Sequence, residues 1–379
     1  MSTDVYEGRD VLSGRAIRVS VRSGVVDETE LVETRADLPW ISHALVDLQI
    51  NGFAGVDINA ADLTPEDVSR MARALAERGT GVWIPTVITQ SHEYIAEVLR
   101  TLAAAAAQDP FVAAAIPFAH IEGPFISPLD GPRGAHDRQF VRDISVEEVQ
   151  SWQEIFPIGY VTLSPHWHDA PKKIAGLRRL GVRVALGHTH ASAEQVAAAS
   201  VAGATMSTHL GNGVKAEIPR HPNLLWEQIA DTSLEAGLIA DGHHLPVAVL
   251  ETVVRAKGVD HCFLVSDSVA LAGSPPGRYT TPVGGEVVLS ADGRLALACD
   301  ERLLAGSAVS LADCVRFAMR NTQLARAEIF AMATAVPGRL LGDLTGGGTV
   351  GTISAGSPAR LVLWNAQLEP VEIVSTDRS

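Results

Sequence analysis

His120 and Glu122 stand two residues apart at the end of the apolar run Ala113–Ala119. Side chains two residues apart on a strand point to the same face, and Gly123 with Pro124 ends the strand directly after them. We therefore expect this run to present an imidazole and a carboxylate at the tip of a buried strand. Such a pair can bind a metal ion, or it can act as an acid and its partner.

Three later apolar runs also end in a side chain that binds metals or moves protons. These ends are His188 after Val182–Gly187, His209 after Ala204–Thr208, and Asp267 after His261–Ser266. Zinc takes imidazole and carboxylate ligands, and a catalytic zinc site keeps one position open for water. Glu122, His188 and His209 would supply three ligands. Together, the four strand ends are typical of a hydrolytic metal site.

Each of these residues also has an ordinary structural explanation. A single buried histidine is most often a hydrogen-bonded core residue, and Asp267 also fits as the N-cap of a following turn. His166 and His168 form another pair of histidines, but they follow a different run, and we interpret them as loop or pocket-wall residues. The repetition of the pattern at four strand ends favours the metal site.

Elements that can position these residues alternate along most of the chain. Expected strands are Ala44–Leu48, Gly81–Pro85, Ala113–His120, Gly159–Leu163, Val182–Leu186, Ala204–Thr208, Leu234–Ile239 and Cys262–Ser266. Expected helices are Pro65–Arg78, Ser91–Ala107, Val146–Glu154, Ala170–Leu180, Ala193–Ala202, Pro246–Lys257 and Leu311–Asn321. Capping-box patterns at Ser145 and Ser192 and an N-cap at Thr64 mark helix starts. Eight strands alternating with helices predict a parallel barrel, whose catalytic groups lie at the carboxyl ends of the strands.

The sequence at the two ends of the chain has a different pattern, which is typical of short strands and turns. We expect them to pair into one small β-sandwich domain. The predicted fold class is thus α/β, a (β/α)8 TIM-like metal-dependent hydrolase barrel with that accessory domain. The expected boundaries are 1–42 for its N-terminal part, 43–335 for the barrel and 336–379 for its C-terminal part.

Composition excludes several classes of function. The net charge of −14 and the lack of a Lys/Arg block argue against nucleic-acid binding. We expect no membrane association, because no apolar run reaches roughly 18 residues and the polar, acidic N-terminus is unlike a signal peptide. The three cysteines form no CxxC pattern, which suits a reducing compartment such as the cytoplasm.

A set of short motifs from residue 45 to the end resembles the amidohydrolase superfamily, specifically the N-acetylglucosamine-6-phosphate deacetylases. The stretch His120–Phe125 followed by Gly134–His136 carries the resemblance first. Further matches are Val46–Gly52, Pro85–Thr86, Gly187–Thr189, Thr208–Asn212, Ala240–His244, Leu264–Asp267 and Leu304–Ser307. The combination is specific, whereas each motif alone is weak.

The resemblance implies roles for individual residues. Glu122, His188 and His209 match the family's metal ligands, and Asp267 matches its catalytic acid/base. Residues implied to bind substrate are Gln49, Ala135, His136, Asn212, Gly213, Arg220, His244, Gly306 and Ser307. The implied reaction converts N-acetylglucosamine 6-phosphate into glucosamine 6-phosphate and acetate. The family also implies a homodimer in which the position of Arg220 reaches phosphate in the neighbouring subunit.

Gln49 and Asn51 stand where many amidohydrolases carry a His-x-His pair that binds a second metal. Amide side chains are poor zinc ligands, and the Gln-x-Asn form resembles the family's single-metal branch. We therefore expect one divalent ion per chain. Zinc is the expected metal, although the same ligands accept iron, cobalt or manganese.

Several departures from the family pattern leave the substrate open. Gly211 replaces an aromatic residue, His190 stands where Asn is usual, and Pro165 with His166 replaces Ala-Pro-Glu. The alternatives are a deacetylase of another N-acyl amino sugar, such as N-acetylgalactosamine 6-phosphate, an unphosphorylated N-acyl compound, and a non-catalytic sugar-phosphate-binding barrel.

Overall fold

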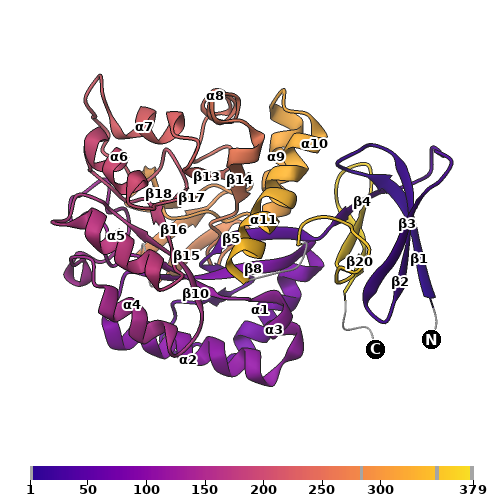
Figure 1. The fold of residues 1–379 in the computed structure, drawn as a ribbon, viewed down its shortest axis with the longest axis horizontal. Coiled ribbons are helices and arrows are strands. Elements are labelled where there is room, and N and C mark those ends of the chain that lie inside the picture. Colours follow the sequence, from indigo (N-terminus) through magenta and orange to yellow (C-terminus); the bar gives the residue numbers. More distant parts are fainter. Residues whose placement is uncertain (1–2, 282–284, 346–349, 376–379) are drawn as a thin grey trace.

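The computed structural model describes residues 3–281, 285–345 and 350–375. Within them, eight parallel strands form one sheet, ordered β5-β8-β9-β10-β11-β12-β13-β14. Their bounds are β5 Leu45–Ile50, β8 Thr80–Ile88, β9 Ala119–Glu122, β10 Ile158–Leu163, β11 Arg183–Leu186, β12 Met206–Ser207, β13 Glu235–Ile239 and β14 Cys262–Val265. Helices cover the outside of this sheet (Figure 1). The expected parallel α/β architecture is confirmed.

The first and last strands of this sheet meet and close it into a barrel. The backbone N–H of Asp267 donates to the carbonyl of Gln49 at 3.0 Å, and that of Asn51 donates to the carbonyl of Ser268 at 2.8 Å. Because this seam runs along the carboxyl ends of β5 and β14, it brings two residues of the Gln-x-Asn motif beside Asp267.

The helices begin largely where the capping signals predict. Their bounds are α1 Pro65–Glu77, α2 His92–Gln108, α3 Pro110–Ala115, α4 Val146–Gln153, α5 Ala170–Arg179, α6 Ala193–Val201, α7 Leu224–Ala230, α8 Val247–Lys257, α9 Leu311–Asn321, α10 Arg326–Ala333 and α11 Ala335–Thr345. Two short 3₁₀ helices are η1 Arg138–Phe140 and η2 Val259–His261. Thr64 and Ser192 form complete capping boxes. At Ser145 only half of the box forms, because the Glu148 carboxylate pairs with Arg142 instead.

The prediction of a strand over Ala113–His120 is wrong in its first half. Residues 110–115 form α3, and the strand begins only at Ala119. Asp109 caps this helix by accepting from the N–H of Phe111, and Pro110 occupies its first position. A short apolar run does not by itself distinguish a buried strand from a buried helix, and this Asp-Pro start signal decides the outcome.

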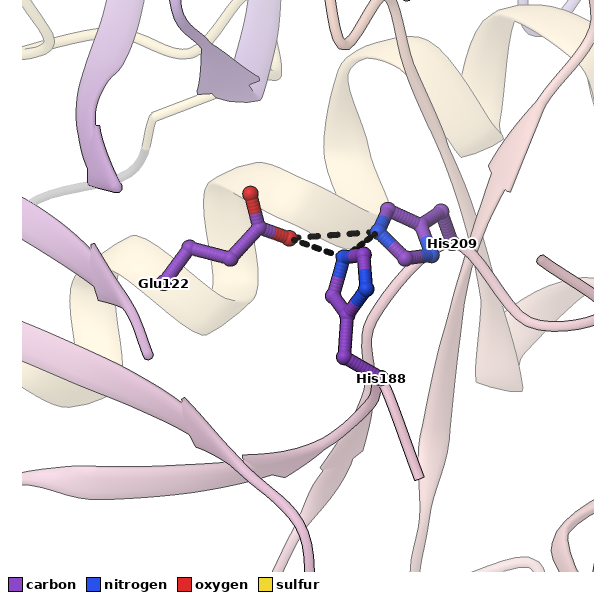
Figure 2. A group of neighbouring side chains, drawn as sticks. All are labelled: Glu122, His188 and His209. Carbon is purple, nitrogen blue, oxygen red and sulfur yellow. Dashed lines mark hydrogen bonds and ion pairs between the residues drawn. The ribbon is translucent and has the colours of Figure 1, made fainter. Parts of the chain in front are cut away.

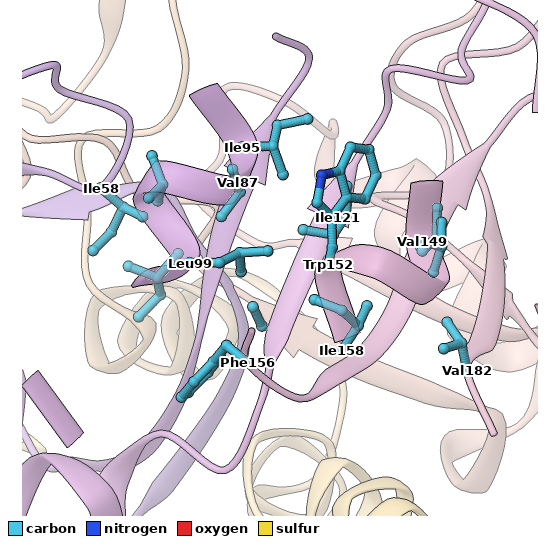
Figure 3. Close-up of a cluster of buried hydrophobic side chains, with 14 of the residues drawn as sticks. Ile58, Val87, Ile95, Leu99, Ile121, Val149, Trp152, Phe156, Ile158 and Val182 are labelled. Carbon is cyan, nitrogen blue, oxygen red and sulfur yellow. The ribbon is translucent and has the colours of Figure 1, made fainter. Parts of the chain in front are cut away.

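Apolar side chains fill two layers around the barrel wall. Val46, Leu48 and Ile84 belong to the inner cluster, which α11 completes on one side with Leu340 and Leu341. The larger outer cluster joins strands to helices, and Figure 3 shows Ile121, Trp152 and Leu99 among its buried members. Burial of one such side chain stabilises the fold by about 1.5–3 kcal/mol. The strand ends above this core are therefore held rigidly.

Segments from both ends of the chain pair in a six-stranded sheet beside the barrel (Figure 1). Its order is β20-β19-β4-β1-β2-β3, with bounds β1 Thr3–Asp10, β2 Ala16–Arg22, β3 Val25–Leu31, β4 Trp40–His43, β19 Leu361–Trp364 and β20 Pro370–Val374. The expected pairing of the two β-rich termini is thus present, and hydrogen bonds join the strands into one sheet.

Two small β elements extend the carboxyl end of the barrel. They are the hairpin β6 Gly52–Phe53 with β7 Val56–Asp57, and an antiparallel sheet of β15 Gly277–Thr281, β16 Gly285–Leu289, β17 Leu295–Leu297 and β18 Asp300–Leu304. The sequence interpretation did not anticipate the second sheet. Among the described helices, none has the length and apolar character needed to cross a membrane.

Candidate active site

Three of the predicted residues meet at the carboxyl end of the barrel. His209 Nε2 lies 3.1 Å from both Glu122 Oε1 and His188 Nε2, and His188 Nε2 lies 3.4 Å from the same carboxylate oxygen. All three side chains are buried. Figure 2 shows them pointing toward one another from separate segments. In the described part of the chain, this trio forms the single group of three or more side chains arranged to hold a metal ion.

The backbone turns sharply at these strand ends. His188, His209 and Asp267 have φ values of 45°, 28° and 49°, which lie in the left-handed region that residues with a side chain rarely adopt. Glu122 is followed by Gly123, whose φ of 85° makes the corresponding turn. Strained backbone of this kind persists where surrounding structure enforces it and clusters at functional sites. The turns aim the side chains inward across the barrel mouth.

Neighbouring groups fix the orientation of the His188 imidazole. His188 Nδ1 lies 2.9 Å from the carbonyl oxygen of Pro132, an acceptor, so Nδ1 carries the proton and Nε2 keeps its lone pair. Gly213 packs so closely that an added Cβ would lie 2.9 Å from the same Nδ1. His136 Nε2 lies 3.3 Å from His188 Nε2, and its Nδ1 contacts Thr89 Oγ1 at 2.8 Å.

The electrostatics of the trio suit a cation. Burial alone would raise the pKa of Glu122, but the contacts of its carboxylate with the imidazoles of His188 and His209 hold that pKa well below its usual value. Burial opposes the charge on His209 too, yet the Glu122 carboxylate raises its pKa. The negatively charged carboxylate of Glu122 thus converges with two imidazole nitrogens. This donor set fits a divalent ion such as zinc.

Asp267 lies beside this cluster and is held by two amides. Gln49 Nε2 donates to Asp267 Oδ1 at 3.0 Å, and Asn51 Nδ2 donates to the same oxygen at 2.8 Å. Gln49 Nε2 also donates to Glu122 Oε1 at 3.0 Å. Burial, reinforced by the charge of Glu122, raises the pKa of Asp267 to about 6. A carboxyl group with this pKa can both accept and return a proton near neutrality.

A cavity of about 630 Å³ opens over these residues. Predicted residues that line it are Glu122, Ala135, His136, His188, His209, Asn212, Gly213, His244, Asp267 and Gly306. Gln49 is buried and reaches the site through its hydrogen bonds, whereas buried Ser307 lies behind the cavity wall, with its carbonyl bonded to the N–H of Val269. Arg220 is exposed and lies outside the lining of this single chain.

Other residues shape the cavity without having been singled out from the sequence. Asp57 and Asn59 line it next to the β6–β7 hairpin, and Thr280 and Leu295 contribute from the unexpected sheet. Asp241 holds His244 through a 2.6 Å contact between Oδ2 and Nδ1. The Gly-Ser-Pro-Pro-Gly turn at Gly273–Gly277 was the available signal for an inserted β segment.

The departures from the family pattern lie beside the cavity. The His166 and His190 rings pack 4.2 Å apart, and neither lines the cavity. His168 is exposed and lies 3.4 Å from its neighbour Asp169, in agreement with its interpretation as a loop residue. A Cβ at Gly211 would meet Leu245 at 3.0 Å, so this position faces a packed side chain.

Comparisons with known proteins agree with this geometry. The amidohydrolase family model matches residues 40–378. An N-acetylgalactosamine-6-phosphate deacetylase from Escherichia coli O157:H7 is 30% identical over 367 residues, which cover 94% of this chain and 92% of that protein. An N-acetylglucosamine-6-phosphate deacetylase from Bacillus subtilis is 29% identical over 86% of this chain and 81% of its own.

Solved structures of similar proteins share the fold. An N-acetyl-D-glucosamine-6-phosphate deacetylase variant from Mycobacterium smegmatis, solved with N-acetyl-D-glucosamine-6-phosphate, has a TM-score of 0.87 at 24% identity, covering 99% of this chain and 98% of that one. The corresponding enzyme from Thermotoga maritima has a TM-score of 0.85 at 23% identity, covering 98% of each chain. A D-hydantoinase matches more distantly, with a TM-score of 0.61 at 12% identity over 99% of this chain and 94% of that one.

Proposed function

The chain belongs to the amidohydrolase family, and on that premise we propose that it hydrolyses the N-acetyl group of N-acetylglucosamine 6-phosphate. The products are glucosamine 6-phosphate and acetate. The observation that carries the proposal is the placement of the Glu122–His188–His209 cluster and the partly buried Asp267 in one cavity. A non-catalytic binding barrel would have no need of this combination.

Glu122, His188 and His209 would hold one divalent ion, for which zinc suits the ligand set. When bound, such an ion polarises an acyl carbonyl and makes water a stronger nucleophile at neutral pH. The position of Gln49 supports a single ion, because its N–H group donates to Glu122 where a second metal would need a lone pair.

Asp267 is the proposed acid/base. Both amide donors engage its Oδ1, which leaves Oδ2 to take a proton from the attacking water and return it to the leaving amine. Its pKa of about 6 suits both transfers. Burial, followed by the neighbouring His188, lowers the pKa of His136 to about 3, so His136 is a neutral hydrogen-bonding group on the cavity wall.

The remaining lining residues suit a polar, anionic sugar. Asn212 and the backbone at Gly213 offer amide groups along one wall, and His244 is held on the cavity by Asp241. Arg220 would complete the phosphate site through its planar, permanently charged guanidinium group. In this proposal Arg220 acts across a homodimer interface, because it is exposed and outside the cavity of its own chain.

Exposed apolar side chains on the helices that follow Arg220 in the chain support the dimer. Trp226 on α7 and Val249 on α8 are 53% and 41% exposed, and these two helices pack side by side. Large exposed apolar side chains on adjacent elements favour a protein interface. Sedimentation of the purified chain tests the proposal, and a strict monomer at micromolar concentration contradicts it.

We also propose a cytoplasmic location, which suits the free cysteines Cys262, Cys299 and Cys314.

Acetate release tests the function. The metal-loaded protein is incubated separately with N-acetylglucosamine 6-phosphate, N-acetylgalactosamine 6-phosphate and unphosphorylated N-acetylglucosamine. We expect the highest kcat/KM with the first. Preference for the second would transfer the assignment to the galactosamine series, for which the 30% identity to the Escherichia coli relative is the supporting observation. No acetate from any of the three would contradict the deacetylase proposal.

A further inference from the structure

The Gln-x-Asn motif at the end of β5 is directed at Asp267, the candidate acid/base. Both carboxamides point at one oxygen of Asp267, at 3.0 Å from Gln49 and 2.8 Å from Asn51. In the sequence, Asn51 lies 216 positions before Asp267, and Gln49 lies 218 positions before it. They exist because the barrel closes there, with backbone bonds between the same two strand ends.

Asn51 adopts this orientation at a cost. Its Oδ1 is buried and has no hydrogen-bond partner among the described residues. A buried polar atom that has lost its water without gaining a hydrogen-bond partner destabilises the folded state. The side chain is therefore oriented by its contact with Asp267 and not by its own acceptor, and an unsatisfied group in a native site calls for a functional explanation.

We propose that Asn51, assisted by Gln49, is a positioning residue that fixes Asp267 for proton transfer. The two N–H donors occupy Oδ1 and restrict rotation about the bond that carries the carboxylate. Oδ2 is then the one oxygen left to exchange protons with water and the leaving amine. The inference rests on the proposed function, since it assigns the motif a role in that reaction.

Asn51 is the residue to test, because its side chain hydrogen-bonds to Asp267 and to no member of the metal cluster. Gln49 also touches Glu122, so its replacement would disturb two groups at once. Asn51→Ala should lower kcat by at least about 10-fold through misalignment, with KM changed by less than about 3-fold. Metal content should stay that of the wild type. Asn51→Asp keeps the shape and removes the donor, and it should lose as much.

A double-mutant cycle separates positioning from a merely structural role. In an Asp267→Asn background there is no acid/base left to position, so adding Asn51→Ala should change kcat by less than about 2-fold. Asn59→Ala is the matched control. Asn59 lines the same cavity but bonds to the backbone of Thr86 and Ile88, so its effect should be the same with or without Asp267.

Three outcomes are distinguishable. A loss from Asn51→Ala that persists in full in the Asp267→Asn background overturns the positioning role. A rise in KM with unchanged kcat also overturns it, because Asn51 would then act in substrate binding. Absence of acetate release by the wild type overturns the proposed function instead, and this is measured first.

Discussion

The carboxamide of Gln49 donates to Glu122 Oε1 at 3.0 Å, so an amide hydrogen points at the carboxylate of the candidate metal cluster. An N–H donor offers no lone pair to a cation. The first strand of the barrel therefore contributes a hydrogen bond to this site where a histidine would contribute a ligand.

From this contact we predict one tightly bound divalent ion per chain. Elemental analysis of the purified, dialysed protein should give a stoichiometry near one. Glu122→Gln should abolish binding, because it removes the charged member of the cluster. Two stoichiometric ions in the wild type, with a second site at Gln49, would be inconsistent with a mononuclear site.

Asp267→Asn should keep the metal and the fold but lower turnover by at least ~10²-fold, the low end for loss of a general acid/base. The cluster retains its three ligands, because Asp267 is not one of them. Metal content, thermal unfolding and acetate release are measured on the same preparation. Asp57→Asn, a second carboxylate on the cavity wall, serves as the control and should lose far less. Near-normal turnover of Asp267→Asn would assign proton transfer to another group.

The pKa of Asp267 predicts an acid limb in the pH dependence of kcat/KM. Burial, together with Glu122, raises this pKa to about 6, and a bound cation moves the limb to lower pH. Below the pKa the carboxyl group is protonated and cannot accept a proton from water. Activity should therefore fall about tenfold per pH unit on the acid side and level off above it. Activity that falls as the pH rises through 6 would contradict a base at this position.

The sequence predicts the barrel because its signals are local. Apolar runs alternate with capped helical segments, and parallel strands must place their carboxyl ends together. That rule is sufficient to bring Glu122, His188 and His209 into one cluster, although they come from different strands. The same local signals did not predict α3. There an Asp-Pro helix start precedes an apolar run that is compatible with a strand or a helix.

The contacts that tune the site depend on closure of the whole barrel. Asn51 meets Asp267 only because β5 and β14 are joined across the seam. Neither residue carries a local signal for that contact. The left-handed backbone at His188 and His209 is likewise enforced by the surrounding packing, since residues with a side chain rarely adopt it. Pair geometry and strain of this kind are properties of the folded barrel.

Arg220 provides the last prediction, which concerns phosphate recognition. Arg220→Ala should raise KM for N-acetylglucosamine 6-phosphate by at least about 10-fold and change kcat little, because binding energy shared by ground and transition states is removed. Unphosphorylated N-acetylglucosamine should be unaffected. Arg100→Ala, on α2 and paired with Glu97, is a control for the loss of a surface charge. Equal processing of both sugars by the wild type would contradict phosphate recognition while leaving the deacetylase proposal intact.

Mixed dimers decide whether Arg220 acts within its own chain or across the interface. Arg220→Ala and Asp267→Asn chains are co-expressed with different tags, and the heterodimer is isolated. If Arg220 reaches the neighbouring cavity, the Asp267→Asn chain supplies its arginine to the site that still holds Asp267. That heterodimer then contains one intact site and should regain the wild-type KM. If Arg220 serves its own chain, each site keeps one defect, and no wild-type site is restored. Because Arg220 is exposed and outside its own cavity, we expect the first result.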